Sequence, residues 1–331
     1  MKLPIELIEN ILSFLINEPY QLFNTSLVNR EFSKISQQFL YSFVCLRPWE
    51  KPNKLSEFFN SIHSNKQLAT LVKSLEVKSF PRNLNTEQTF SLYQLVLECL
   101  PSFIRLQSIS WTRSNTLTDD ILIALSKLPT LKCLEINGDH SFDFDLCFNS
   151  NEWKQLNSFK VILPNRQMTV PLKKFLIGKC NQLSTLGILG RESNFINDTD
   201  LVELANHLKN LHTLSLGGLK RVSIQGINPL LQANCNTIRN LCLESLSFSS
   251  LSSQTPFVNL PNLQSLTFTI GSQSNNEIQL NTFLQLINSA HNLSSLTIYS
   301  SGFENIPTIS QDFFENISHL YNLKYLRVSI L

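Results

Sequence analysis

The stretch Leu211-His-Thr-Leu-Ser-Leu216 carries leucine at its first, fourth and sixth positions. Leu214 and Leu216 lie two residues apart, which is the period of a β-strand, so both side chains point to one face. The same spacing of apolar residues occurs ten times, in nine steps that cover 251 residues and average about 28. A nearly constant step of this length predicts stacked units that each add one strand to a parallel sheet. The ten stretches begin at Val72, Leu106, Leu131, Leu156, Leu183, Leu211, Ile238, Leu263, Leu293 and Leu323.

The segments between these stretches carry helical patterns. Residues 118–128 open with a threonine and two aspartates, which favour the start of a helix, and continue with apolar residues at helical spacing. Residues 200–208 have a similar pattern. Parallel neighbours need a crossover connection, usually a helix, so each unit is expected to contain one strand and one helix. Residues 139–155 and 245–259 have little helical pattern and are expected to be irregular loops.

This arrangement resembles the leucine-rich repeat family in its longer, helix-bearing form. Cys180 and Cys235 each lie three residues before the first apolar residue of a strand, as in the cysteine-containing subtype. The resemblance implies an α/β solenoid shaped like a horseshoe, with a parallel sheet on the concave side and helices on the convex side. The asparagine or cysteine usual after the strand is replaced by Leu219, Leu246 and Pro164 in three repeats.

Residues 1–46 carry a different pattern. Pro4 suits the first turn of a helix, and an apolar stripe follows it at helical spacing. The stripe contains Ile8, Ile11, Leu12 and Leu15, and an adjoining face contains Leu3, Leu7 and Phe14. This is more apolar surface than a lone terminal helix can bury. A second helix is predicted over residues 26–35, and residues 41–46 predict a strand that leads into the repeats.

The motif L-P-x-E-L-x-x-x-I-L-x-x-L, at residues 3–15, resembles the F-box. Residues 26–32 resemble a second F-box stretch, although Asn29 stands where cysteine or serine is commoner and Phe32 where tryptophan is. The resemblance implies that this segment binds the Skp adaptor of an SCF-type ubiquitin ligase, and through it a cullin. The residues implied in that contact are Leu3, Pro4, Glu6, Leu7, Ile11, Leu12 and Val28. An alternative is that the helices only cap the first repeat, and the two roles are compatible.

No catalytic or metal-binding pattern is found in the sequence. Of its six histidines, His207 and His212 have no nearby cysteine or acid at metal-ligand spacing, and the sequence has no H-E-x-x-H, no G-x-S-x-G and no glycine-rich phosphate loop. Asp198 and Asp200 are interpreted as residues that start a helix, and Gly217 and Gly218 as a turn after a strand. We therefore expect no enzymatic activity, no cofactor and no bound metal.

The composition indicates the cellular compartment and excludes some classes of partner. Seven scattered cysteines, an odd number without C-x-x-C, argue for reduced thiols and a cytoplasmic or nuclear protein. Glu6 and Glu9 interrupt the first apolar stretch, which makes it a poor signal peptide, and no apolar run is long enough to span a membrane. The net charge of +2 is too small to favour nucleic acid or an anionic membrane as a partner.

The residues that alternate with the inner leucines should line the concave face of the sheet. Most of them are small and neutral, and many carry hydroxyl groups. Aromatic and arginine side chains, which are typical of interaction hot spots, occur there at Tyr299, Tyr325 and Arg327. We expect a target protein to bind at these three residues; the alternative is that the face is only solvated.

The sequence thus predicts an F-box helical domain at residues 1–46 and a solenoid of about ten leucine-rich repeats at residues 47–331. The function expected from the two resemblances is that of a non-catalytic substrate-recognition subunit of an SCF-type ubiquitin ligase. The F-box would bind the Skp adaptor, and the repeats would bind a target protein whose identity the sequence does not give. The alternative is a stand-alone leucine-rich-repeat scaffold without a role in ubiquitin transfer.

Overall fold

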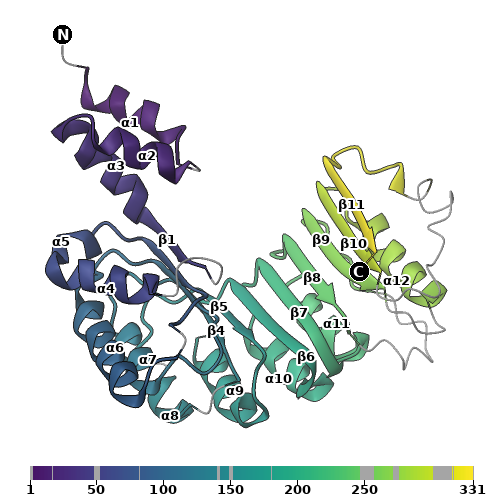
Figure 1. The fold of residues 1–331 in the computed structure, drawn as a ribbon. Coiled ribbons are helices and arrows are strands. Elements are labelled where there is room, and N and C mark those ends of the chain that lie inside the picture. The colour runs from purple at the N-terminus through teal and green to yellow at the C-terminus, as the bar shows by residue number, and fades with distance from the viewer. Residues whose placement is uncertain are drawn as a thin grey trace. The chain divides into compact units, whose positions relative to one another are not determined.

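The computed structural model describes residues 3–16, 18–47, 53–81, 83–139, 142–148, 152–179, 181–246, 257–270, 276–300, 315 and 317–330. The chain divides into two compact units, one made of residues 1–136 with 151–155 and the other of residues 137–150 with 156–331. Both units contain parallel strands with helices between most of them along the chain (Figure 1).

The first unit begins with three helices, α1 (Ile5–Ser13), α2 (Pro19–Ser26) and α3 (Arg30–Ser42). Its strands pair in parallel and in chain order, so that Val44, Leu75, Ile109 and Leu134 lie in one row across the sheet. The strands are β1 (Phe43–Leu46), β2 (Ser74–Val77), β3 (Ser108–Trp111) and β4 (Cys133–Asn137). Between them lie α4 (Lys54–Ser64), α5 (Lys66–Ala69), α6 (Thr86–Cys99), the 3-10 turn η1 (Leu100–Ser102) and α7 (Asp119–Ser126).

The second unit continues the same plan with parallel strands in chain order. Its strands are β5 (Ser158–Ile162), β6 (Thr185–Asn197), β7 (Thr213–Arg221), β8 (Asn240–Glu244), β9 (Ser265–Ile270), β10 (Ser295–Ser300) and β11 (Tyr325–Ile330). Its helices are α8 (Phe144–Cys147), the 3-10 turn η2 (Arg166–Met168), α9 (Thr169–Gly178), α10 (Asp198–His207), α11 (Ile224–Ala233) and α12 (Asn276–Ser289).

The repeat spacing predicted the core correctly. The apolar residue at the fourth position of each repeat lies in register with its counterparts on the neighbouring strands. In the second unit this row is Phe159, Leu186, Leu214, Leu241, Leu266, Leu296 and Leu326. All but Leu326 are buried, and each buried side chain contributes about 1.5–3 kcal/mol. Each unit therefore has the strand-and-helix repeat of a leucine-rich-repeat solenoid.

Polar side chains tie successive repeats together. Asn262, Asn292 and Asn322 each donate a side-chain hydrogen bond to a backbone carbonyl of the preceding repeat. Asn234 is fully buried, where it donates to the carbonyls of Leu208 and Leu230 and accepts from the backbone N–H of Leu211. These bonds satisfy backbone groups that the turns would otherwise leave unpaired.

Two helix starts follow the sequence reasoning closely. The hydroxyl of Thr118 accepts a hydrogen bond from the N–H of Ile121, as a capping threonine should. The helix expected from Asp200 begins two residues earlier, because Asn197 and Asp200 form a reciprocal capping box.

Three other predictions were wrong. Gly217 and Gly218 lie inside β7, because Gly218 adopts φ 60° and lets the strand continue to Arg221 and bury Leu219. The helix predicted over residues 26–35 is split, since α2 ends at Ser26 and Asn29 caps α3. The region expected to be an irregular loop at residues 139–155 contains α8. Cys180 and residues 247–256 lie outside the described residues.

Candidate interaction surfaces on the helical segment and the sheet

Helices α1, α2 and α3 enclose a small apolar core of their own. Its buried side chains are Ile8 and Leu12 of α1, Leu22 of α2 and Ile35 of α3, with Leu15, Phe32, Phe39 and Leu40 packed around them. The hydroxyls of Thr25 and Ser36 are 3.0 Å apart and join α2 to α3 within hydrogen-bond distance. The side chain of Asn29 accepts from the N–H of Phe32 and fixes the start of α3.

A second apolar row on α1 faces solvent. Leu7 and Ile11 are four residues apart and lie on one side of α1. Leu3 and Phe14 continue the spacing just before and just after the helix. In chain order, the exposed fractions of the four residues are 51%, 48%, 51% and 80%. We call these four residues the α1 stripe. Phe23, Leu27 and Val28, at the end of α2 and in the turn that follows, are more than half exposed as well. Exposed apolar residues gathered in this way are typical of protein-binding surfaces.

The residues that the F-box resemblance implied in adaptor contact differ in their exposure. Leu3, Pro4, Glu6, Leu7, Ile11 and Val28 are exposed. Leu12 is only 1% exposed and lies in the helical core, so its assignment to a contact surface is wrong. Sequence reasoning also missed Ile5, Ile16, Tyr20, Phe23 and Leu27, which are exposed apolar residues of the same segment.

The three helices lead directly into the sheet. Helix α3 ends at Ser42, and β1 begins at Phe43 with no residue between them. The N–H of Lys73 donates to the carbonyl of Ser42, and β1 then pairs with β2 along its whole length. A strand was predicted over residues 41–46, and the structure confirms it from Phe43 onward.

The sheet residues expected to bind a target lie on β10 and β11. The guanidinium of Arg327 lies over the ring of Tyr299, 5.8 Å from its centroid, and Arg327 Nε donates to Ser329 Oγ at 3.1 Å. Tyr325 is paired in register with Ser295 and is 71% exposed. The structure thus brings Tyr299 and Arg327 together and places Tyr325 two residues away on the same face of β11.

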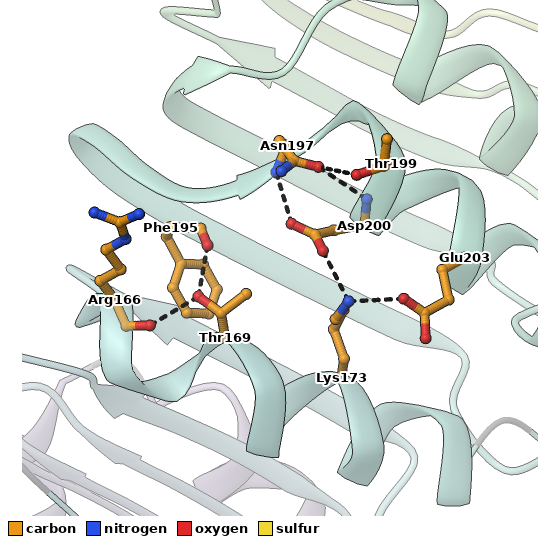
Figure 2. Close-up of polar contacts among 8 residues, drawn as sticks. All are labelled: Arg166, Thr169, Lys173, Phe195, Asn197, Thr199, Asp200 and Glu203. Atoms are coloured by element: carbon orange, nitrogen blue, oxygen red, sulfur yellow. Dashed lines mark hydrogen bonds and ion pairs between the residues drawn. The ribbon is translucent and has the colours of Figure 1, made fainter.

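The acids near the start of α10 are used in structural contacts (Figure 2). Asp200 Oδ2 accepts from the N–H of Asn197, and Asp200 Oδ1 accepts from Lys173 Nζ of α9 at 2.8 Å. Lys173 also donates to Glu203, and these two hydrogen bonds raise the pKa of its ammonium above the ordinary value. Asp198 accepts from both the backbone N–H and the hydroxyl of Ser223, at the start of α11. The interpretation of Asp198 and Asp200 as helix-start residues is confirmed.

Two cysteines on the strands, Cys45 and Cys242, have raised thiol pKa values. Burial, followed by the charge of Glu244, raises the pKa of Cys242 to about 12. Burial is also the main cause that raises the pKa of Cys45, whose Sγ donates to Glu76 Oε2 at 3.2 Å. A nucleophilic or metal-binding cysteine needs the opposite change in pKa. Among the residues that the structure describes, no group of three or more histidines, cysteines and acids could hold a metal ion.

Comparison with known proteins gives one family match. The sequence model of the COS11 F-box domain matches residues 1–80, which include α1–α3, β1 and β2. The chain therefore carries an F-box domain at its N-terminus, followed by the leucine-rich-repeat solenoid described above. No helix in the described part of the chain is both long and apolar enough to cross a membrane.

Among solved structures, the chain is similar to the crystal structure of a TLR13-ssRNA13 complex, with 15% sequence identity and a TM-score of 0.42. The similarity covers 80% of this chain and 34% of that chain, so this chain spans about a third of that protein. The comparison with curated proteins gives no match.

Proposed function

We propose that this chain is the non-catalytic substrate receptor of an SCF-type ubiquitin ligase. The observation that supports this proposal most directly is the α1 stripe. The segment matches an F-box model and already has a packed core, yet a second apolar row along its first helix is exposed. A capping role alone would not require this row. Burying it against a partner would contribute about 25 cal/mol for each Å² removed from water.

The proposed adaptor contact consists of exposed residues only. It is made by Leu3, Pro4, Glu6, Leu7, Ile11 and Val28, and the buried Leu12 supports it from the helical core. The proposed partner is a Skp-type adaptor, which links the chain to a cullin. The domain boundary proposed for this role follows residue 46, after which the repeats begin.

The repeats are proposed to hold the target protein at Tyr299, Tyr325 and Arg327. No chemical step is assigned to this chain. Its contribution is to hold the target near a ubiquitin-conjugating enzyme carried by the complex, which raises the local concentration of the reacting groups. The proposed compartment is the cytoplasm, the nucleus or both.

The test is co-purification of the full-length chain with a Skp adaptor. The double variant Leu7→Asp with Ile11→Asp places two charges in the α1 stripe and should abolish co-purification. Val170→Asp is the matched control, because Val170 is an apolar residue of α9 that is 72% exposed and lies outside the F-box. It should leave co-purification unchanged.

The alternative is a stand-alone leucine-rich-repeat scaffold whose N-terminal helices only cap the sheet. The pairing of β1 with β2 directly after α3 favours such a capping role, and it is compatible with adaptor binding. If the wild-type chain does not co-purify with the adaptor, the scaffold function replaces the ligase function.

A further inference from the structure

The outward face of β9, β10 and β11 has an unusual composition. Leu266, Phe268, Leu296 and Ile298 are buried on one side of the sheet, so the alternating residues lie on the other side. Those nine positions are Ser265, Thr267, Thr269, Ser295, Thr297, Tyr299, Tyr325, Arg327 and Ser329. Eight of them carry a hydroxyl group, and the ninth is arginine. Arg327 is thus the only charged residue among the nine.

The guanidinium of Arg327 makes two contacts with neighbouring side chains of the sheet. The ring of Tyr299 lies beneath it at 5.8 Å, and Ser329 Oγ accepts from Nε at 3.1 Å. The cation–π contact with Tyr299 and the hydrogen bond to Ser329 both favour this position of the guanidinium. The two Nη atoms form the other edge of the guanidinium, and neither makes a polar contact within the described part of the chain. This edge is the one that can donate two parallel hydrogen bonds to a carboxylate.

Electrostatics also favours an anion here. The nearest acid on the described sheet face is Glu244, at the end of β8, and β9 and β10 separate it from Arg327. At about 4.8 Å per strand, this separation is about 14 Å. Thr297 is paired in register with Arg327 on the neighbouring strand. Its hydroxyl can donate to an oxygen atom of a bound anion that the guanidinium leaves unpaired.

We propose that the face of β9–β11 binds an aspartate or glutamate side chain of the target protein, with Arg327 as the bidentate partner. The proposal rests on the proposed function, because it names the chemistry of the target segment. A carboxylate is favoured over a phosphate because one guanidinium balances a single negative charge, whereas a phosphoryl group carries about −1.5 to −2.

The test uses a phage-displayed library of random 12-residue peptides, selected on the full-length chain. The selected peptides should share an aspartate or glutamate. Replacing this acid with its amide should weaken binding to the wild-type chain at least tenfold and weaken binding to Arg327→Gln less than twofold. Arg327→Lys should restore only part of the affinity, because a lysine cannot form the bidentate pair. Arg239→Gln is the control, because Arg239 is exposed on the same unit but precedes β8.

Three outcomes would overturn the proposal: selected peptides without a shared acid, no peptide whose binding depends on Arg327, or a phosphoserine peptide that binds more than tenfold tighter than its glutamate counterpart. The last outcome would replace the carboxylate with a phosphorylated segment. Adaptor co-purification is measured with the same Arg327→Gln protein. It should be intact, so a failure of the ligase function and a failure of acid recognition give separate signals.

Discussion

Ile11 and Leu12 are consecutive residues of α1 with opposite surroundings: Ile11 is 51% exposed, whereas Leu12 is 1% exposed and packs in the core of the three helices. Leu12→Ala should therefore lower the free energy of unfolding of the helical segment by about 2–5 kcal/mol. Ile11→Ala should change it by about 0.5 kcal/mol or less. Hydrogen exchange of the α1–α3 amides measures this difference. At a temperature where both variants are folded, Ile11→Ala should weaken binding to the proposed adaptor more than Leu12→Ala does. Equal losses of stability would contradict the placement of Leu12 in the core and of Ile11 on the surface.

Gly218 is the position in β7 where a side chain should be least tolerated. Its φ of 60° disfavours other residues, and a Cβ there would overlap the carbonyl oxygen of Gly190. We expect Gly218→Ala to cost at least about 1–3 kcal/mol of stability, measured by urea denaturation. Gly217→Ala is the matched control, because its Cβ would meet the end of the flexible Leu189 side chain. A larger loss at Gly217 than at Gly218 would refute this explanation.

Asn234 should be more important for stability than the exposed asparagines that link repeats. Asn234→Ala removes the partners of the Leu208 carbonyl and the Leu211 N–H, and each buried group left unpaired costs about 1–3 kcal/mol. Asn292 makes one exposed hydrogen bond, to the carbonyl of Pro261, so Asn292→Ala should cost less than about 1 kcal/mol. Denaturant midpoints of the two variants compare these effects directly.

Cys242 gives a prediction for alkaline pH. Its pKa in the folded chain is raised from 9.0 to about 12, so folding favours the neutral thiol. This contribution to stability is fully present below pH 9 and is lost as the pH rises from 9 toward 12. The stability difference between wild type and Cys242→Ser should shrink over this range. Iodoacetamide should label Cys242 slowly at pH 8 in the folded chain and faster in urea; equal rates would show that the thiol is not shielded.

Strand positions were predictable because the period of the apolar residues is set by the pleat and by the length of the repeat. The row from Phe159 to Leu296 is buried as that period requires. The division of α1 into a buried and an exposed side was not predictable in full. Leu12 and Ile11 both fit an apolar helical stripe, and only the positions of Leu22 and Ile35, from two other helices, decide which one is buried.

The extension of β6 and β7 depends on relations that no local pattern contains. From the local sequence alone, Gly218 predicts a turn. In the structure it continues a strand, because the backbone of Gly190 on the neighbouring strand lies against it. The hydroxyl-rich face was visible in the sequence. The cation–π contact of Arg327 with Tyr299 depends on the register between β10 and β11, which pairs Thr297 with Arg327 and leaves Tyr299 diagonal to it.

Because α3 ends at Ser42 and β1 begins at Phe43, the number of residues at this junction determines which side chains of β1 face the core. Side chains alternate between the two faces of a strand, so inserting a single residue at this junction while the helices stay fixed would reverse β1. Leu46 would then turn outward and Cys45 inward. The alternative is that β1 keeps its register and the helical segment is forced to rotate. Either way, the insertion would disturb the join between the helical segment and the first repeat, without changing a single residue of the proposed adaptor contact.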